Sequence, residues 1–158
     1  MKRLAVVPGS FDPMTVGHED LIRRAASLFG SCLVLVMNNR EKNYALSLSE
    51  RFELARLVFE GEENIRVASS EGMLYEYLLS LKEKTVLVKG IRNEKDLAYE
   101  QNMARFNFEK SGVETVYLDA REGLCTVSST LIRQMNREER ENCPYLSEKA
   151  VKYLQNKL

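Results

Sequence analysis

The sequence predicts an α/β protein in which one doubly wound, five-stranded parallel sheet is covered by helices on both faces. Three observations support this fold class. The chain has 158 residues, a length that suits one domain with its own hydrophobic core. Short apolar runs alternate with stretches of helical periodicity along the whole sequence. No repeat, low-complexity tract or linker interrupts the alternation, so residues 1–158 are expected to form a single domain.

Five short apolar runs predict buried strands. The first run, LAVV, ends at Pro8-Gly9, and the second, CLVLVM, ends before a polar stretch. The expected strands cover residues 4–7, 32–37, 65–68, 85–88 and 115–118. Strands that are separated by helices favour parallel pairing with right-handed crossovers, and a doubly wound order is the expected topology.

The helices are predicted from apolar residues at helical spacing and from residues that begin or end helices. The first helix is expected to end at Gly30. Ser47 and Glu50 have the spacing of a capping box, and Ser128 or Ser129 is expected to begin a short helix. The expected helices run from about 17 or 18 to 29, from 47 to 59, from 73 to 81, from 94 to 109, from 128 or 129 to 135, and from 147 onward.

Composition disfavours several classes of function. Lys and Arg together number 23, as do Asp and Glu, so we expect no general attraction to nucleic acid or to an anionic membrane. No apolar run approaches the roughly 20 residues of a membrane-spanning helix, and the first residues lack the apolar stretch of a secretion signal. Cys32, Cys125 and Cys143 are widely spaced without a CxxC pair, which predicts neither a disulfide framework nor a zinc site. A cytoplasmic protein is expected.

The turn after the first strand holds the only histidine of the chain, His18. The carboxyl ends of parallel strands meet at one edge of the sheet, where such folds bind ligands. Gly9 and Gly17 would let the backbone approach a ligand there, and a helix start offers free amides and a partial positive charge. A histidine that merely caps a turn is the alternative, but the sequence of strand, glycine turn and helix favours a functional role for His18.

Cations follow two other strands. Lys42 comes after the second strand and could bind a phosphate or simply lie in a solvated loop. After the fourth strand, the segment 89–92 (KGIR) puts two cations beside a backbone that a ligand can approach. Two neighbouring cations need an anion, so this pattern favours phosphate binding, with an internal ion pair to Asp96 or Glu100 as the alternative. Asp96 and Glu100 lie four apart on one helix face, where either could orient a cation or contact a ribose, with a plain surface pair as the alternative.

The fifth strand leads to three successive hydroxyl residues, Ser128, Ser129 and Thr130, at the start of a helix. They could bind phosphate oxygens, or one of them could serve as an ordinary helix cap. The sequence has no GxxxxGK[ST] and no GxGxxG after the first strand, which disfavours a P-loop nucleotidase and an ordinary dinucleotide-binding fold. A single histidine excludes a multi-histidine metal site, and nothing near Cys125 indicates an activated thiolate paired with His18.

Taken together, these segments resemble the HxGH nucleotidyltransferases. GSFDPMTVGH has the TxGH form typical of bacterial phosphopantetheine adenylyltransferases. The likeness extends through Lys42, LSLSER, VKGIR, the helix with Asp96, Tyr99 and Glu100, and VSST. The resemblance implies a Rossmann-like nucleotidyltransferase fold. It also implies an enzyme of coenzyme A synthesis, which converts ATP and 4'-phosphopantetheine into dephospho-coenzyme A and pyrophosphate.

The same resemblance implies a cofactor, an assembly and a role for each matched residue. Mg²⁺ would be bound mainly through the ATP phosphates, the chain would form a homohexamer of two trimers, and coenzyme A would inhibit by feedback. His18 would stabilise the transition state of a direct in-line attack. The acceptor would be bound by Ser10, Lys42, Leu74 and Lys89. ATP would be bound by Ser10, Phe11, His18, Gly90, Ile91, Arg92, Glu100, Leu124, Cys125, Thr126, Val127, Ser128, Ser129 and Thr130.

Three positions depart from the family pattern, and two other functions remain open. Ser10 and Thr130 keep a hydroxyl, whereas Lys89 stands where many members have arginine and loses a planar, two-pronged grip on phosphate. A transferase that acts on nicotinamide mononucleotide or glycerol phosphate more often carries HxGH, whereas Thr15 fills the first position here. A non-catalytic flavodoxin-like module would bind a nucleotide or a flavin without turnover.

Overall fold

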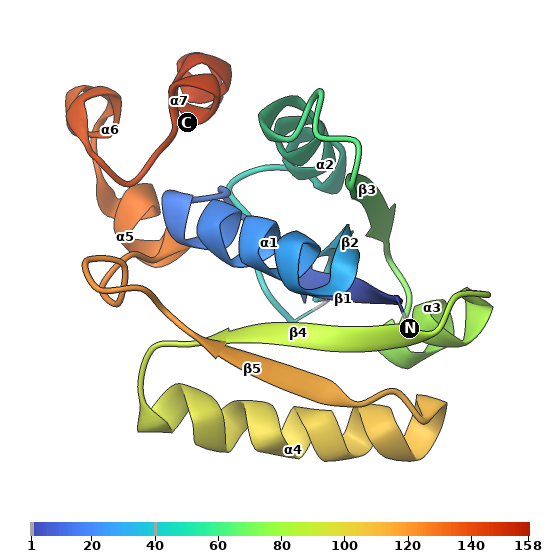
Figure 1. Cartoon of the computed structure of the whole chain (residues 1–158). Coiled ribbons are helices and arrows are strands. Elements are labelled where there is room, and N and C mark those ends of the chain that lie inside the picture. Colours follow the sequence, from blue (N-terminus) through green and yellow to red (C-terminus); the bar gives the residue numbers. More distant parts are fainter. Residues whose placement is uncertain (1, 40) are drawn as a thin grey trace.

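The computed structural model describes residues 2–39 and 41–158, in which five parallel strands form one sheet in the order β3-β2-β1-β4-β5 (Figure 1). The strands are β1 (Arg3–Gly9), β2 (Gly30–Met37), β3 (Ile65–Ser70), β4 (Thr85–Ile91) and β5 (Thr115–Asp119). β1 is central and pairs with β2 on one side and β4 on the other. The doubly wound α/β fold expected from the sequence is therefore confirmed, and its strand order reverses between β1 and β4.

Helices connect these strands and continue beyond the last one. They are α1 (Val16–Phe29), α2 (Leu48–Val58), α3 (Leu74–Ser80), α4 (Glu94–Ser111), α5 (Ser129–Gln134), α6 (Arg137–Asn142) and α7 (Glu148–Leu154). Ser47 and Glu50 form the expected capping box, and Gly30 ends α1 with a φ of 93°. The sequence analysis did not predict α6, although Asn136 and Glu139 cap it in the same reciprocal way. No helix in the described ranges is long and apolar enough to cross a membrane.

Each face of the sheet has its own layer of helices. On one face, α1, α2 and α7 bury residues such as Ile22, Leu54 and Leu154 against alternate side chains of the central strands. On the other face, Leu78 of α3 packs against Leu4 and its neighbours. α4 lies along β4 and β5 (Figure 1), yet of its 18 residues only Asn107 is buried. The two layers leave the carboxyl edge of the sheet open at the turns that follow β1, β4 and β5.

β4 is longer than the sequence predicts. The expected strand stops at residue 88, because lysine and glycine read as a strand end, but the observed strand continues to Ile91. β5 extends as far as Asp119 and pairs Lys89 with Tyr117 and Gly90 with Leu118. Lys89 and Gly90 therefore lie in the paired carboxyl-terminal part of β4 and not in a loop, which restrains the position of the Lys89 side chain.

Candidate active site

The turn after β1 is built around the ring of Phe11. Phe11 has a φ of 50°, a left-handed conformation that costs roughly 1–2 kcal/mol for a residue with a side chain. Its ring is buried and meets the imidazole of His18 edge to face, with 5.1 Å between ring centroids. A Cβ on Gly9 would come within 3.0 Å of this ring. The absence of a side chain at Gly9 therefore makes room for Phe11, and Gly9 also lines the cavity described below.

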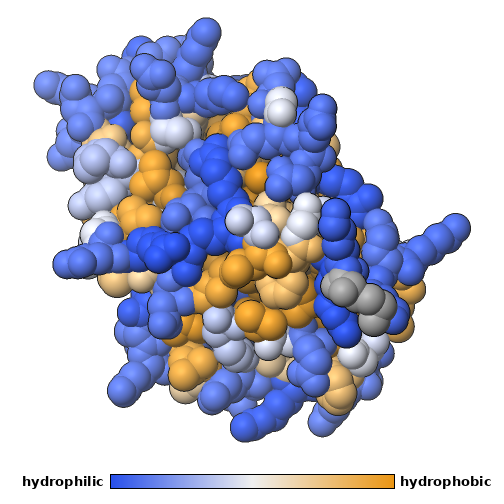
Figure 2. Space-filling view, viewed as in Figure 1, coloured by the Kyte–Doolittle hydropathy of each residue, from blue (hydrophilic) through white to orange (hydrophobic). Residues whose placement is uncertain are grey.

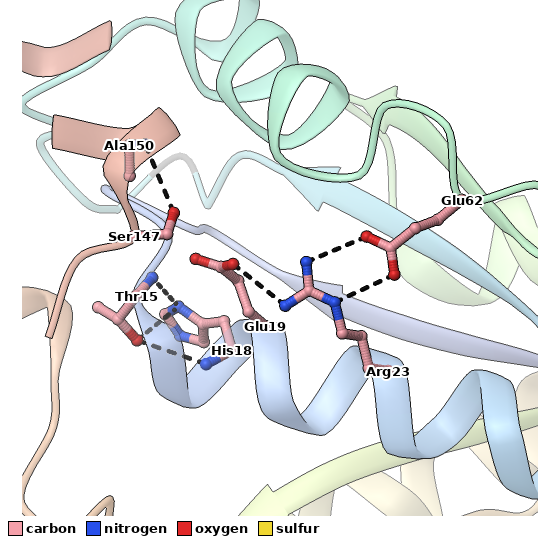
Figure 3. A network of polar contacts seen from close by, with 7 residues as sticks. All are labelled: Thr15, His18, Glu19, Arg23, Glu62, Ser147 and Ala150. Carbon is pink, nitrogen blue, oxygen red and sulfur yellow. Dashed lines mark hydrogen bonds and ion pairs between the residues drawn. The ribbon is translucent and has the colours of Figure 1, made fainter. Parts of the chain in front are cut away.

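His18 is held by the cap of α1 (Figure 3). Thr15 is the N-cap, and its side-chain oxygen accepts a hydrogen bond from the backbone N–H of His18. In return, the backbone N–H of Thr15 donates to Nδ1 of His18 over 3.0 Å. This is a capping box in which histidine takes the place of the usual Glu or Gln. Because Nδ1 accepts a hydrogen bond, the proton of the neutral ring is assigned to Nε2, which is then a hydrogen-bond donor.

The surroundings of His18 keep its imidazole neutral. Burial lowers the pKa of His18 from 6.5 to about 4, and the positive charge of Arg92 acts in the same direction. The ring is partly exposed to the cavity described below. A neutral imidazole with its N–H on Nε2 can donate a hydrogen bond to a phosphate oxygen without carrying a charge of its own.

The next residue along α1 turns to the other side of the helix. Glu19 is buried and pairs with Arg23 at 3.2 Å, and Arg23 makes two further hydrogen bonds to Glu62 (Figure 3). The guanidinium also lies over the ring of Phe59, 5.2 Å from its centroid. This network fixes α1 against the segment before β3, so the helix that carries His18 is anchored away from the site.

A cavity of about 340 Å³ opens where β1, β4 and β5 end, and His18 lies in its wall. The turn after β1, the first half of α1, the end of β4, the start of α4 and the loop before α5 all contribute to its lining. Eleven of the residues expected at the site line it together: Phe11, His18, Lys89, Gly90, Arg92, Glu100, Leu124, Val127, Ser128, Ser129 and Thr130. The expected convergence of distant turns on one sheet edge is thus observed.

Carboxylates already pair with the two cations of the KGIR segment. Nζ of Lys89 lies 3.3 Å from Glu100, and Nε of Arg92 lies 3.0 Å from Asp96. Arg92 also donates to the carbonyl of Val127 over 3.4 Å. The sequence analysis gave internal ion pairs to Asp96 or Glu100 as the alternative to phosphate binding, and the structure contains both of these pairs. All four charged side chains line the cavity, so an entering phosphate would have to exchange with Asp96 or Glu100.

The three hydroxyls at the start of α5 also have protein partners. Ser128 is the N-cap and accepts from the backbone of Leu131, which makes it the ordinary helix cap considered above. Ser129 donates to the carbonyl of Pro13 over 2.8 Å, and Thr130 accepts from Arg133. Arg133 in turn donates to the carbonyl of Asp12 over 2.7 Å. The bonds of Ser129 and Arg133 attach α5 to the turn after β1, which fixes one wall of the cavity.

Other expected residues lie outside the lining of this cavity: Ser10, Lys42, Leu74, Ile91, Cys125 and Thr126. Ile91 is buried, whereas Cys125 is exposed. Leu74 lines a second cavity of about 110 Å³ between α3, α4 and β4, and that cavity shares Lys89 and Glu100 with the first. Lys42 is exposed in the loop after β2.

The sequence analysis missed several polar residues of the cavity wall. Arg24 donates to the carbonyl of Asp119 over 2.9 Å and pairs with Asp20, so it ties α1 to the end of β5. Asp20, Arg24, Asp119 and Arg121 all line the cavity. The four-residue spacing of Asp20 and Arg24 on one helix face was a usable signal. Arg121, two residues after β5, follows the same strand-end rule that identified Lys89.

Comparison with known proteins identifies the chain as a nucleotidyltransferase. Residues 6–135 match the cytidylyltransferase-like family, so the chain belongs to it. A solved structure of Plasmodium falciparum nicotinic acid mononucleotide adenylyltransferase, complexed with NaAD, superposes with a TM-score of 0.71. That superposition covers 98% of this chain and 95% of the other, at 14% identity. At this identity the likeness concerns the fold alone.

Sequence relatives narrow the family. The phosphopantetheine adenylyltransferase of Clavibacter michiganensis subsp. michiganensis is 43% identical over 150 residues, which covers 92% of this chain and 91% of the relative. The enzyme of the same name from Azoarcus sp. is 36% identical and covers 98% and 95% of the two chains. The chain therefore belongs to the phosphopantetheine adenylyltransferase family.

Proposed function

We propose that this protein transfers the adenylyl group of ATP to 4'-phosphopantetheine and so produces dephospho-coenzyme A and pyrophosphate. The names of its relatives support this acceptor. The structural observation that carries the proposal is the position of His18 in the cavity wall. Its Nδ1 is occupied by the helix cap, and within residues 2–39 and 41–158 no partner is seen for Nε2–H, which could therefore donate to a ligand.

The reaction is a direct in-line displacement. A phosphate oxygen of the acceptor attacks the α-phosphorus of ATP, a new P–O bond forms, and the bond to the β-phosphate oxygen breaks as pyrophosphate leaves. The acceptor phosphate is largely dianionic at neutral pH, since its second pKa is about 6, so no general base is needed. The protein acts by positioning the reactants and by stabilising charge on the pentacoordinate phosphorus.

His18 is the proposed transition-state stabiliser. Because the pKa of His18 is about 4, almost none of the ring is protonated at neutral pH. The imidazolium that general acid catalysis needs is therefore scarce, which favours a hydrogen-bonding role for the neutral ring. Nε2–H would donate to a non-bridging oxygen of the α-phosphate. Such donors typically contribute about 3–4 kcal/mol to a transition state.

ATP would occupy the larger cavity. Arg92 would exchange Asp96 for a phosphate, and Glu100 would be released toward the ribose. The nucleotide would be enclosed by the backbone of Gly90 and Ile91, by the side chain of Phe11 and by residues 124–130. The ion pairs that must be exchanged are partly exposed, and pairs of this kind are worth roughly 0.2–1 kcal/mol, so a polyphosphate can displace them.

The acceptor would bind beside ATP. Lys89 borders both cavities, and an acceptor phosphate at Lys89 would lie next to the nucleotide. The chain of the acceptor would then extend past Leu74, with Ser10 and Lys42 contributing from the turns after β1 and β2. Coenzyme A, which contains the same chain, would compete for this site and act as the feedback inhibitor.

Mg²⁺ fits this arrangement as a companion of ATP. Within residues 2–39 and 41–158 no group of three or more His, Cys, Asp or Glu side chains could hold a metal ion. The phosphate oxygens would therefore supply most of its ligands. Bound in that way, Mg²⁺ neutralises charge on the polyphosphate.

Assembly into a homohexamer of two trimers is part of the proposal. Tyr99, Met103 and Phe106 of α4 are exposed, Tyr99 by 67%, although they are large and apolar. Figure 2 shows a further apolar area in the middle of the molecule, framed by hydrophilic side chains. Exposed apolar patches framed by polar residues are typical of interaction sites. Light scattering on the purified protein would test the assembly.

A cytoplasmic location, where Cys32, Cys125 and Cys143 stay reduced, is also part of the proposal.

The deciding experiment is a pyrophosphate-release assay with product analysis. The wild-type protein, ATP, Mg²⁺ and 4'-phosphopantetheine are expected to give dephospho-coenzyme A, whereas nicotinamide mononucleotide and glycerol phosphate are expected to give none. His18→Ala should lower kcat by about a hundredfold or more, and His18→Gln, which keeps an N–H donor, should recover part of the rate. Turnover of another acceptor alone, or nucleotide binding without turnover, as a flavodoxin-like module would show, contradicts the proposal.

A further inference from the structure

A buried cation lies beneath the turns after β1 and β2. The side chain of Arg51, in the first turn of α2, is only 1% exposed. Its Nη1 donates to the carbonyls of Ser10 and Met37, at 2.9 Å each, and its Nε donates to the carbonyl of Leu46 over 3.1 Å. Nη2 donates to the side chain of Asn38. One guanidinium therefore binds oxygens from two separate turns.

Asp12 and Tyr44 complete the surroundings of this cation. The ring of Tyr44 lies 4.0 Å from the Arg51 guanidinium carbon, in cation–π contact. The carboxylate of Asp12 is buried and accepts the backbone N–H groups of Ala45 and Leu46, both at 2.9 Å. Asp12 also acts electrostatically on Arg51 and supplies its counter-charge. Arg51 and Asp12 thus hold the loop after β2 at both of its ends.

Stability alone is a weak reason for a buried charge of this kind. Replacing a buried ion pair by well-packed apolar side chains is often neutral or stabilising, because desolvation offsets the attraction. An apolar side chain could fill the volume of Arg51 but could not bind four loop oxygens. The rigid fork of a guanidinium is suited to that task. The burial of Arg51 is therefore better explained by its positioning of the two turns than by its contribution to core packing.

The two turns that Arg51 joins carry Lys42, expected at the acceptor, and Ser10, expected at both the acceptor and ATP. Neither Arg51 nor the oxygens it binds belong to residues that line the ATP cavity, within the part of the chain that the structure describes. Three of the four oxygens that Arg51 binds border the loop of Lys42, which is expected at the acceptor alone, so a change at Arg51 should affect acceptor binding more than ATP binding. We propose that Arg51, with Asp12 as its counter-charge, is a positioning residue that sets the Ser10 turn and the Lys42 loop relative to each other for acceptor binding.

This inference rests on the proposed function, and steady-state kinetics test it. Arg51→Lys keeps the charge but offers an ammonium with three donors and no planar fork. We expect KM for 4'-phosphopantetheine to rise about tenfold or more, while kcat and KM for ATP change less than about threefold. Arg23→Lys is the matched control, because Arg23 also combines hydrogen-bonded carboxylates with an aromatic ring but contacts neither turn. It should leave KM for 4'-phosphopantetheine unchanged.

Amide hydrogen exchange provides a readout that needs no turnover. In Arg51→Lys the amides of Ala45 and Leu46 should exchange about tenfold faster, while the loop 120–128 keeps its wild-type rates. Parallel rises of both KM values, or unchanged exchange at Ala45 and Leu46, would overturn the inference. Should Arg51→Lys fail to fold, Tyr44→Leu replaces it, with the same direction expected at smaller size. Faster exchange in a protein whose wild type does not adenylylate the acceptor would refute the proposed function but not the loop-holding role.

Discussion

The most informative prediction concerns the titration of His18. Burial and the charge of Arg92 lower the pKa of His18 from 6.5 to about 4. This disfavours the protonated imidazole by about 3 kcal/mol relative to water. Protonation would also place a second N–H opposite the backbone N–H of Thr15, which now donates to Nδ1. The ring should therefore be neutral throughout the physiological range, with its proton on Nε2.

Nuclear magnetic resonance can measure this directly. The chain has a single histidine, so long-range ¹H–¹⁵N spectra of the ligand-free protein contain one imidazole to follow from pH 8 to pH 3.5. The nitrogen shifts should report the Nε2–H tautomer and no titration near pH 6.5. Arg92→Gln should raise the pKa but leave it below 6.5, since burial is the larger cause. A pKa at or above 6.5, or an Nδ1–H tautomer, would refute the reasoning about the cap.

The same shift predicts a change in stability. Between pH 6.5 and about 4 the unfolded chain binds a proton at His18 that the folded chain does not bind. The free energy of unfolding should therefore fall as the pH drops through this window, by up to about 3 kcal/mol from this group, with no further loss below it. Comparing urea denaturation of the wild type and His18→Gln at pH 7 and pH 4.5 isolates the contribution. An equal pH response in both proteins would argue against it.

Three further outcomes are expected. Glu100→Gln removes the partner of Lys89, a pair worth roughly 0.2–1 kcal/mol, so KM for the acceptor should fall up to about fivefold while KM for ATP rises, as measured in initial-rate assays. Gly90→Ala would bring a Cβ to 3.2 Å from the side chain of Leu21 in the cavity wall, so calorimetry should show weaker ATP binding with little change in melting temperature. Ile22→Ala empties a fully buried position of α1 and should cost about 2–5 kcal/mol in urea denaturation, and a smaller loss would mean that the core closes over the gap.

Much of the fold was predictable because apolar periodicity reports local burial. LAVV and CLVLVM have no polar interruptions, and both became central strands. The capping box at Ser47 was equally readable, because its two bonds join residues three positions apart. The end of β4 could not be predicted, because it depends on pairing with β5, and this pairing joins residues that are far apart in the sequence. Helix α6 was missed because its polar residues leave no apolar stripe to detect.

The residues of the site also fall into a group that the sequence could place and a group that it could not. His18 and the KGIR segment could be placed because each follows a predicted strand, and strand ends meet in this topology. The partners of Lys89 and Arg92 could be named only as alternatives, because the choice between Glu100, Asp96 and a phosphate depends on distances that sequence does not contain. Arg51 was read as part of a helix start. Its burial depends on carbonyls from two other segments, which no local pattern encodes.

The cap of α1 also determines when the imidazole of His18, the proposed transition-state stabiliser, takes its direction. Because the ring of His18 closes the first turn of its own helix, its direction is set during folding and does not wait for nucleotide to arrive. Little rotational freedom is then left to lose at the moment of reaction. A ring that swung away would also release the backbone N–H of Thr15 at the helix start, so misalignment of the imidazole removes half of the capping box that begins α1.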